Sequence, residues 1–220
     1  MATKSAAKEV IEIKPIETVE TVIRIQGDTP LIVHAWSEKA KREMLEAQMG
    51  NKKGRKKEPK DPVQDFIRSM YWLTPMPEKM TEEGFTEAIE NGAEFGFPAT
   101  GLKQATISAA YRAGWVPDKV SLRGAFFIFG DENGMLKIHS DTPLMREDMV
   151  KVGMGTADIR YRGEFRNWYI DFVLSYNKNG QYSQEAIVNM INAGGYTVGI
   201  GEWRPEKDGT YGMYHVASAS

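Results

Sequence analysis

Alternating apolar and polar positions predict the first secondary structure along the chain. Between residues 16 and 26, β-branched and polar side chains alternate with the period of a strand that has one solvated face. Turn residues interrupt the run at 27–30, and apolar residues resume at 31–36. The pattern predicts one interrupted strand.

The clearest alternation lies at residues 167–176, where large apolar side chains from Trp168 to Tyr176 fall on one face. Residues 120–130 and 135–139 are also predicted strands, and the Asn133-Gly134 dipeptide between them is typical of a tight hairpin turn. A further hairpin is predicted within 149–166 and a last strand at 211–216.

Capping residues delimit four predicted helices. A residue that caps well precedes each apolar-periodic segment, and glycines follow three of these segments. The predicted N-caps are Ser37, Asp61, Thr100 and Ser183, and the helices they open run to about residues 49, 72, 113 and 193. Residues 81–96 carry no clear pattern.

The order of these elements predicts the fold class. Without insertions at about 37–92 and 140–166, the chain reads strand, helix, strand, strand, helix, strand. That is the split βαβ order of an α+β, ferredoxin-like (RRM-like) fold. We therefore expect a flexible N-terminus over residues 1–15 and a single domain over 16–216 that carries a helical insertion and an inserted β-hairpin.

Composition is that of a soluble globular protein. The 220 residues are 41% apolar and 26% charged, and no apolar run approaches the roughly 20 residues of a membrane span. The chain has no cysteine, which excludes disulfides, thiolate metal ligands and cysteine nucleophiles. The first residues lack the apolar region of a secretory signal, so a cytoplasmic location is expected.

Positive charge is concentrated in two places, although the net charge of −2 argues against coating of nucleic acid by bulk charge. The first is a basic loop without apolar residues, which either folds over a nucleic-acid backbone or is a solvated loop. Its candidate residues are Lys52, Lys53, Arg55, Lys56 and Lys57.

The second concentration is the predicted hairpin. Lys151, Arg160, Arg162 and Arg166 form one positive face if they bind phosphates, because residues two apart on a strand share a side. In the alternative, these arginines pair with the nearby carboxylates of Asp148, Asp158 and Glu164.

The stretch 193–216 is rich in glycine. Glycine is used where φ is positive, or where a ligand or another backbone comes too close for a Cβ. One interpretation is a loop whose amides near Gly199 and Gly201 meet an anion; the other is a helix end at Gly194-Gly195 followed by bulged strands. Trp203 offers a base-stacking surface and Arg204 a charge, although aromatic residues in such segments are more often core.

No combination of residues predicts a cofactor or metal site. The three histidines lack the spacing of a zinc site, and the glycines lack the Gly-Lys-Ser/Thr ending of a phosphate loop. His34 is the one candidate for a general base in metal-independent RNA cleavage, against the alternative of a structural histidine. Catalysis is not predicted.

Two segments carry a family resemblance. Residues 97–110, Phe-Pro-Ala-Thr-Gly-Leu-Lys-Gln-Ala-Thr-Ile-Ser-Ala-Ala, and the glycine-rich residues 199–212 resemble motifs of the RAMP superfamily. That family includes the backbone subunits and repeat-processing nucleases of CRISPR systems. This sequence departs from the first motif at Thr100-Gly101 and Gln104, and its glycine loop is interrupted at 204–208. The chain is also similar to uncharacterised phage and prophage proteins.

The resemblance implies that Lys103 faces a phosphate, with the glycine loop beside it along a single strand. It implies a non-catalytic, single-stranded nucleic-acid-binding protein, RNA being favoured over DNA, that self-associates along the strand. Two alternatives stay open. One is a repeat-processing endoribonuclease with His34 as base, and the other is a phage structural or inhibitor protein that binds a protein complex.

Overall fold

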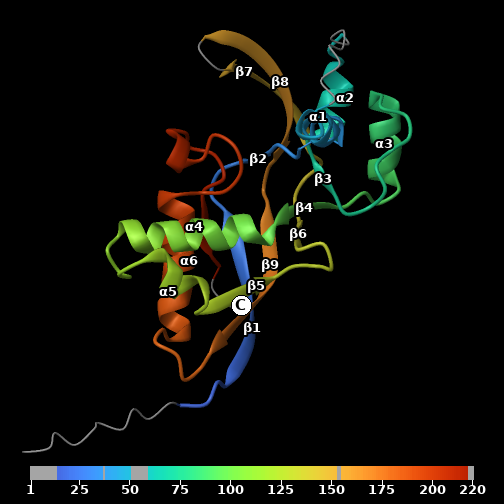
Figure 1. Ribbon diagram of the computed structural model, residues 1–220. Helices are drawn as coiled ribbons and strands as arrows, with labels where there is room; N and C mark the ends of the chain where they lie inside the picture. Colours follow the sequence, from blue (N-terminus) through green and yellow to red (C-terminus); the bar gives the residue numbers. More distant parts are fainter. Residues whose placement is uncertain (1–13, 37, 51–58, 153–154, 218–220) are drawn as a thin grey trace, which may run out of the picture.

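The computed structural model describes residues 14–36, 38–50, 59–152 and 155–217 (Figure 1). The fold is mixed α+β with antiparallel sheets. Its strands are β1 (Thr18–Gly27), β2 (Leu31–Val33), β3 (Tyr71–Trp72), β4 (Phe95–Pro98), β5 (Phe126–Phe129), β6 (Met135–Ile138), β7 (Leu144–Val152), β8 (Thr156–Phe165), β9 (Tyr169–Asn177) and β10 (Tyr214–Val216). Its helices are α1 (Glu38–Gln48), α2 (Pro62–Arg68), α3 (Glu82–Glu90), α4 (Ala99–Arg112), α5 (Lys119–Arg123), α6 (Gln184–Thr197) and the 3-10 turn η1 (Pro205–Lys207).

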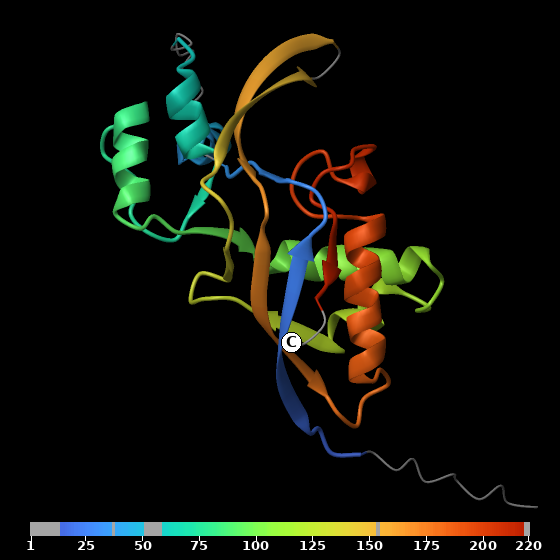
Figure 2. The same cartoon turned by 180° about the vertical axis from the view of Figure 1, so that it is seen from behind.

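A four-stranded sheet with the order β10-β1-β9-β5 forms the centre of the molecule. Each pair of neighbours is antiparallel. Alternate residues of β1, including Ile23 and Ile25, are buried against α4 and α6, whereas Val22 and Arg24 are exposed on the opposite face. Figure 2 shows β1 and β9 in front with α4 passing behind them, so the helices cover one face and leave the other open.

Two further sheets have the orders β2-β8-β7 and β3-β4-β6. The predicted hairpin is present as β7 and β8, longer than expected, and it projects away from the central sheet (Figure 1). The prediction that residues 31–36 continue the first strand is wrong. After Gly27 the chain turns, held by the Gly27 N–H to Trp168 O bond (2.8 Å) and the Trp168 Nε1–H to Thr29 O bond (2.8 Å). This turn lets β2 pair with β8 instead.

The predicted strand over 120–130 is also wrong in its first half. The side chain of Asp118 accepts a hydrogen bond from the Ser121 N–H and opens α5, so only Phe126–Phe129 is strand. The predicted hairpin across Asn133-Gly134 does not form either. The turn is present, with Gly134 N–H donating to Asp131 O at 2.9 Å, but β5 pairs with β9 and β6 pairs with β4.

Three helix limits differ from those predicted. Helix α2 keeps its Asp61 cap but ends at Arg68, because Tyr71 and Trp72 pair with β4. Helix α4 begins at Ala99, which places Thr100 inside it and not at its cap. Helix α6 runs through Gly194 and Gly195 to Thr197. These two glycines let α6 approach its neighbours: a Cβ at Gly195 would lie 1.9 Å from Tyr214 O.

One apolar core links the sheets and helices, and Trp168, Phe126 and Leu102 are among its fully buried side chains. Within the described ranges, no helix combines the length and apolar character needed to cross a bilayer.

Candidate functional site

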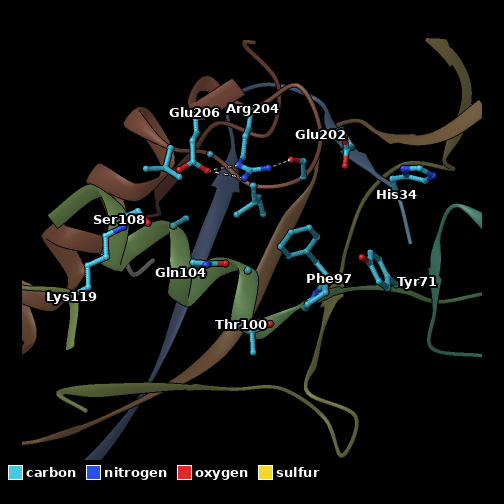
Figure 3. Close-up of a pocket in the computed structure, with 17 residues that line it drawn as sticks. His34, Tyr71, Phe97, Thr100, Gln104, Ser108, Lys119, Glu202, Arg204 and Glu206 are labelled. Carbon is cyan, nitrogen blue, oxygen red and sulfur yellow. Dashed lines mark hydrogen bonds and ion pairs between the residues drawn. The ribbon is translucent and has the colours of Figure 1, made fainter. Parts of the chain in front are cut away.

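A groove of about 450 Å³ lies between α4 and the loop that follows α6 (Figure 3). The glycine-rich stretch therefore does lie beside the first helix of the predicted core. Four of the sequence-predicted residues line this groove, namely His34, Gly199, Gly201 and Arg204. Lys103 does not line it, because the helical residues that face the groove are those near Thr100, Gln104 and Ser108.

The glycines of this loop accommodate the protein's own backbone. Gly199, Gly201 and Gly212 have φ values of 69°, 77° and 63°, in the left-handed region that favours glycine. A Cβ on Gly201 would lie 2.3 Å from Ile32 O. The Gly199 and Ile200 N–H groups donate to Gly194 O (2.8 Å) and Gly212 O (3.0 Å). Two amides of the stretch that was predicted to hold phosphates are therefore committed internally.

Arg204 is fixed within the groove. Its guanidinium donates to Gly201 O at 2.9 Å and to Glu206 Oε2 at 2.8 Å. Arg112 bonds the other oxygen of the same carboxylate, Glu206 Oε1. Burial alone would raise the pKa of Glu206, but the hydrogen bonds and charges of Arg204 and Arg112 outweigh it and lower that pKa. Trp203, with φ of 52°, is 37% exposed and lies outside the groove lining.

His34 and Glu202 lie at the other end of the groove (Figure 3). The Arg162 Nη2 lies 3.3 Å from the Glu202 carboxylate, and Arg162 itself is only 2% exposed. Burial lowers the pKa of His34, and the positive charge of Arg162 lowers it further. The imidazole is therefore neutral at physiological pH.

The arginines of the hairpin β7–β8 are paired with carboxylates. Arg162 contacts Asp148 at 3.1 Å, Arg160 contacts Asp158 at 3.5 Å and Arg166 contacts Glu164 at 2.8 Å. The predicted positive face is therefore wrong, and the alternative of ion pairing describes this hairpin. The sequence did not indicate that Arg146 belongs to this group of ion pairs. Its guanidinium donates to Asp148, Glu164 and the Tyr211 hydroxyl.

The five candidates of the basic loop, Lys52, Lys53, Arg55, Lys56 and Lys57, lie outside the described residues. Just after that loop, Lys60 bonds the Asp158 carboxylate and the Ile159 carbonyl of the hairpin. Lys151 lies exposed near the end of β7.

Lys103 turns toward β5 and away from the groove. Its Nζ donates to Arg123 O at 2.8 Å and lies 4.4 Å from the centroid of the Phe127 ring. Burial lowers the pKa of this ammonium group. Among the residues that the structure describes, no carboxylate pairs with Lys103, so its charge is left uncompensated beside an aromatic ring.

That ring belongs to an aromatic group on the open face of the central sheet. Phe127 and Phe129 are 46% and 50% exposed, and their rings lie within 9° of parallel with centroids 6.2 Å apart. On β9, the Tyr169 ring lies between the Arg24 guanidinium, 4.1 Å from its centroid, and the parallel ring of His139, at 4.5 Å. Sequence reasoning missed these residues, although the alternation Phe126-Phe127-Ile128-Phe129 places Phe127 and Phe129 on one face.

Within the described part of the chain, His, Asp and Glu side chains form no group of three that could hold a metal ion. No protein-family model matches the chain, and a search of curated proteins finds no match.

Proposed function

We propose that this chain is a single-stranded nucleic-acid-binding protein built on a ferredoxin-like core, as in the RAMP superfamily that its sequence resembles. The element order β1, α4, β5, β9, α6, β10 and the sheet order β10-β1-β9-β5 support that core, since this is the split βαβ arrangement. RNA is favoured over DNA on the ground of the resemblance alone.

The observation that carries the proposal is the group formed by Lys103, Phe127 and Phe129. Two exposed, parallel aromatic rings beside an unpaired ammonium group match the two parts of a nucleotide, because bases stack on aromatic faces and phosphates attract cations. Such stacking tolerates any sequence, since every base has a π face. We therefore assign the proposed phosphate contact of Lys103 to this position beside Phe127, at the edge of the sheet, and not to the glycine loop.

A second cation on this face, Arg24, is compensated by a carboxylate. Arg24 forms a two-pronged ion pair with Asp171, with both N···O distances at 2.7 Å. Because its charge is paired, the Arg24 guanidinium serves to hold the Tyr169 ring, over which it lies. The phosphate contact in this proposal is therefore Lys103. Binding through Lys103 and several rings is expected to depend on stacking more than on salt.

Self-association along the strand belongs to the same proposal. The cross-strand neighbours Met149 and Ile159 are 76% and 43% exposed on the projecting hairpin, an apolar surface suited to a second copy. Sedimentation with strands of increasing length tests this: the mass of the complex should rise by whole protein copies, and one copy on every length would contradict it.

The binding test compares wild type with a Phe127→Ala/Phe129→Ala double variant, using fluorescence anisotropy on a 3′-labelled single strand that carries a 5′-hydroxyl. Each lost stacking contact costs about 1–3 kcal/mol, so affinity should fall at least tenfold. Trp115→Ala is the matched control, because Trp115 is 53% exposed and lies outside β5 and the groove. Equal affinities for all three proteins would contradict the proposal.

A second candidate function is supported by His34. A neutral imidazole lining a groove is suited to accept a proton from a 2′-hydroxyl, as a metal-independent endoribonuclease requires. Cleavage of RNA but not of its 2′-deoxy counterpart, lost in His34→Ala, would establish this activity.

A further inference from the structure

One end of the groove beside α4 is cationic. Lys119 lines that end near Ser108, and no carboxylate of the described residues pairs with it (Figure 3). Its nearest recorded partner is the Tyr111 ring, 5.4 Å from Nζ to centroid. Arg204 lines the same end, and it shares the single carboxylate of Glu206 with Arg112. Lys119 and Arg204 thus line this end together with Glu206, whose carboxylate Arg112 also contacts, and this leaves an excess of positive charge.

The other end of the groove is aromatic and uncharged overall. Phe97 and Tyr71 line it in an edge-to-face arrangement, with centroids 6.5 Å apart and planes at 77°. Gly101 makes room for the Phe97 ring, because a Cβ there would lie 2.8 Å from Phe97 Cε1. Glu202 is balanced by Arg162, and the neighbouring imidazole of His34 adds no charge.

Between the two ends, the amide side chain of Gln104 extends into the groove from α4 (Figure 3). An amide offers both donors and an acceptor, so it can bond the polar edge of a base or the hydroxyls of a sugar. The groove thus presents a cationic group, an amide and an aromatic pair in sequence along about 450 Å³, within the size range of small-ligand sites.

We propose that this groove binds a nucleoside monophosphate group, with the phosphate at Lys119 and Arg204 and the base beside Phe97 and Tyr71. The ligand is either a free nucleotide or the 5′-phosphorylated end of a strand, and only the strand-end form rests on the proposed function. A bare anion would leave the aromatic end unused, and an uncharged nucleoside would leave the cationic end unused.

The test measures two affinities by calorimetry or anisotropy: that of AMP against adenosine, and that of a 5′-phosphorylated strand against the same strand with a 5′-hydroxyl. Charge-assisted contacts to the phosphate should make the phosphorylated member of at least one pair bind about tenfold tighter. In Lys119→Gln that preference should be lost. The control is Lys207→Gln, which removes the same charge from an exposed residue outside the groove lining.

The outcomes separate the two ligand sources. Preference for AMP alone identifies a free nucleotide, and preference for the phosphorylated strand alone identifies a strand end. No preference in either pair, or a preference that Lys119→Gln leaves unchanged, overturns the proposal. These results are independent of the sheet face: a strand with a 5′-hydroxyl that fails to bind counts against the proposed function, whereas AMP binding at the groove can still succeed.

Discussion

The Nζ of Lys103 lies 4.4 Å from the centroid of the Phe127 ring and 2.8 Å from the Arg123 carbonyl. The residue that resembles a family lysine on the first core helix therefore faces the edge strand β5 of the sheet, across α4 from the glycine loop. A cation–π contact holds the Lys103 ammonium beside the exposed Phe127 ring. One nucleotide can therefore stack its base on the ring and place its phosphate at the ammonium.

Lys103→Gln should weaken strand binding about fivefold and reduce the magnitude of the salt slope, d log K/d log[salt], by about 0.7, the value for one phosphate contact on a single strand. The fold should survive, since the ammonium bonds only a carbonyl and an aromatic ring. The measurement is a binding titration at several salt concentrations. Lys178→Gln, at an exposed pair with Glu17, is the control. An unchanged slope in Lys103→Gln would remove this lysine from the interface.

Gly201→Ala should destabilise the protein by about 2–4 kcal/mol, because a side chain at φ 77° is strained and its Cβ would lie 2.3 Å from Ile32 O. Denaturant unfolding measures this loss. Gly124→Ala is the matched control: its φ is −91° and no atom lies within 4 Å of the added Cβ, so stability should change by less than about 1 kcal/mol. Similar losses in both variants would show that the loop is not held against β2.

Local signals in the sequence predicted much of the fold. The alternation along β9 and the caps at Asp61 and Ser183 depend on neighbouring residues only, and each element is present. Strand pairing depends on contacts distant in sequence. Nothing near Leu31 indicates that β2 joins β8, and nothing near Met135 indicates that β6 joins β4.

The candidate site was less predictable for the same reason. The glycine spacing predicted positive φ angles, and Gly199 and Gly201 have them. The sequence did not show that the atom excluding a Cβ at Gly201 is the carbonyl oxygen of Ile32 in β2. The sequence left two alternatives for Arg162, a phosphate contact or pairing with nearby carboxylates, and the fold pairs it with Asp148 across the hairpin and with Glu202 of the glycine loop. The sequence named Asp148 as a possible partner, but nothing near Arg162 indicates Glu202, which is distant in sequence.

Asp148→Asn should cost about 3 kcal/mol of stability. Asp148 is 6% exposed and accepts from Arg162 and Arg146, and removing one partner of a buried ion pair leaves an uncompensated charge. Asp158→Asn on the same hairpin should cost less than about 1 kcal/mol, because its partners Lys60 and Arg160 are largely solvated. Chemical denaturation of both variants measures the difference, and equal losses would contradict the view that the inner pairs stabilise the hairpin.

The pH dependence of stability should report on His34. Its pKa in the folded protein lies below the ordinary value of about 6.5, first because the ring is buried and second because Arg162 is near. Between the folded pKa and about 6.5 the unfolded chain therefore binds a proton that the folded chain does not, so the free energy of unfolding falls as pH drops through this window and is fully restored above it.

His34→Gln removes this proton difference and leaves His139 and His215 in place, so the comparison isolates one imidazole. From pH 7.5 to pH 5.5, wild type should lose more stability than His34→Gln, as measured by urea unfolding at each pH. Parallel stability curves for the two proteins would show that the imidazole titrates as freely in the folded state as in the unfolded one. His34 would then be charged at mildly acidic pH and unsuited to act as a base there.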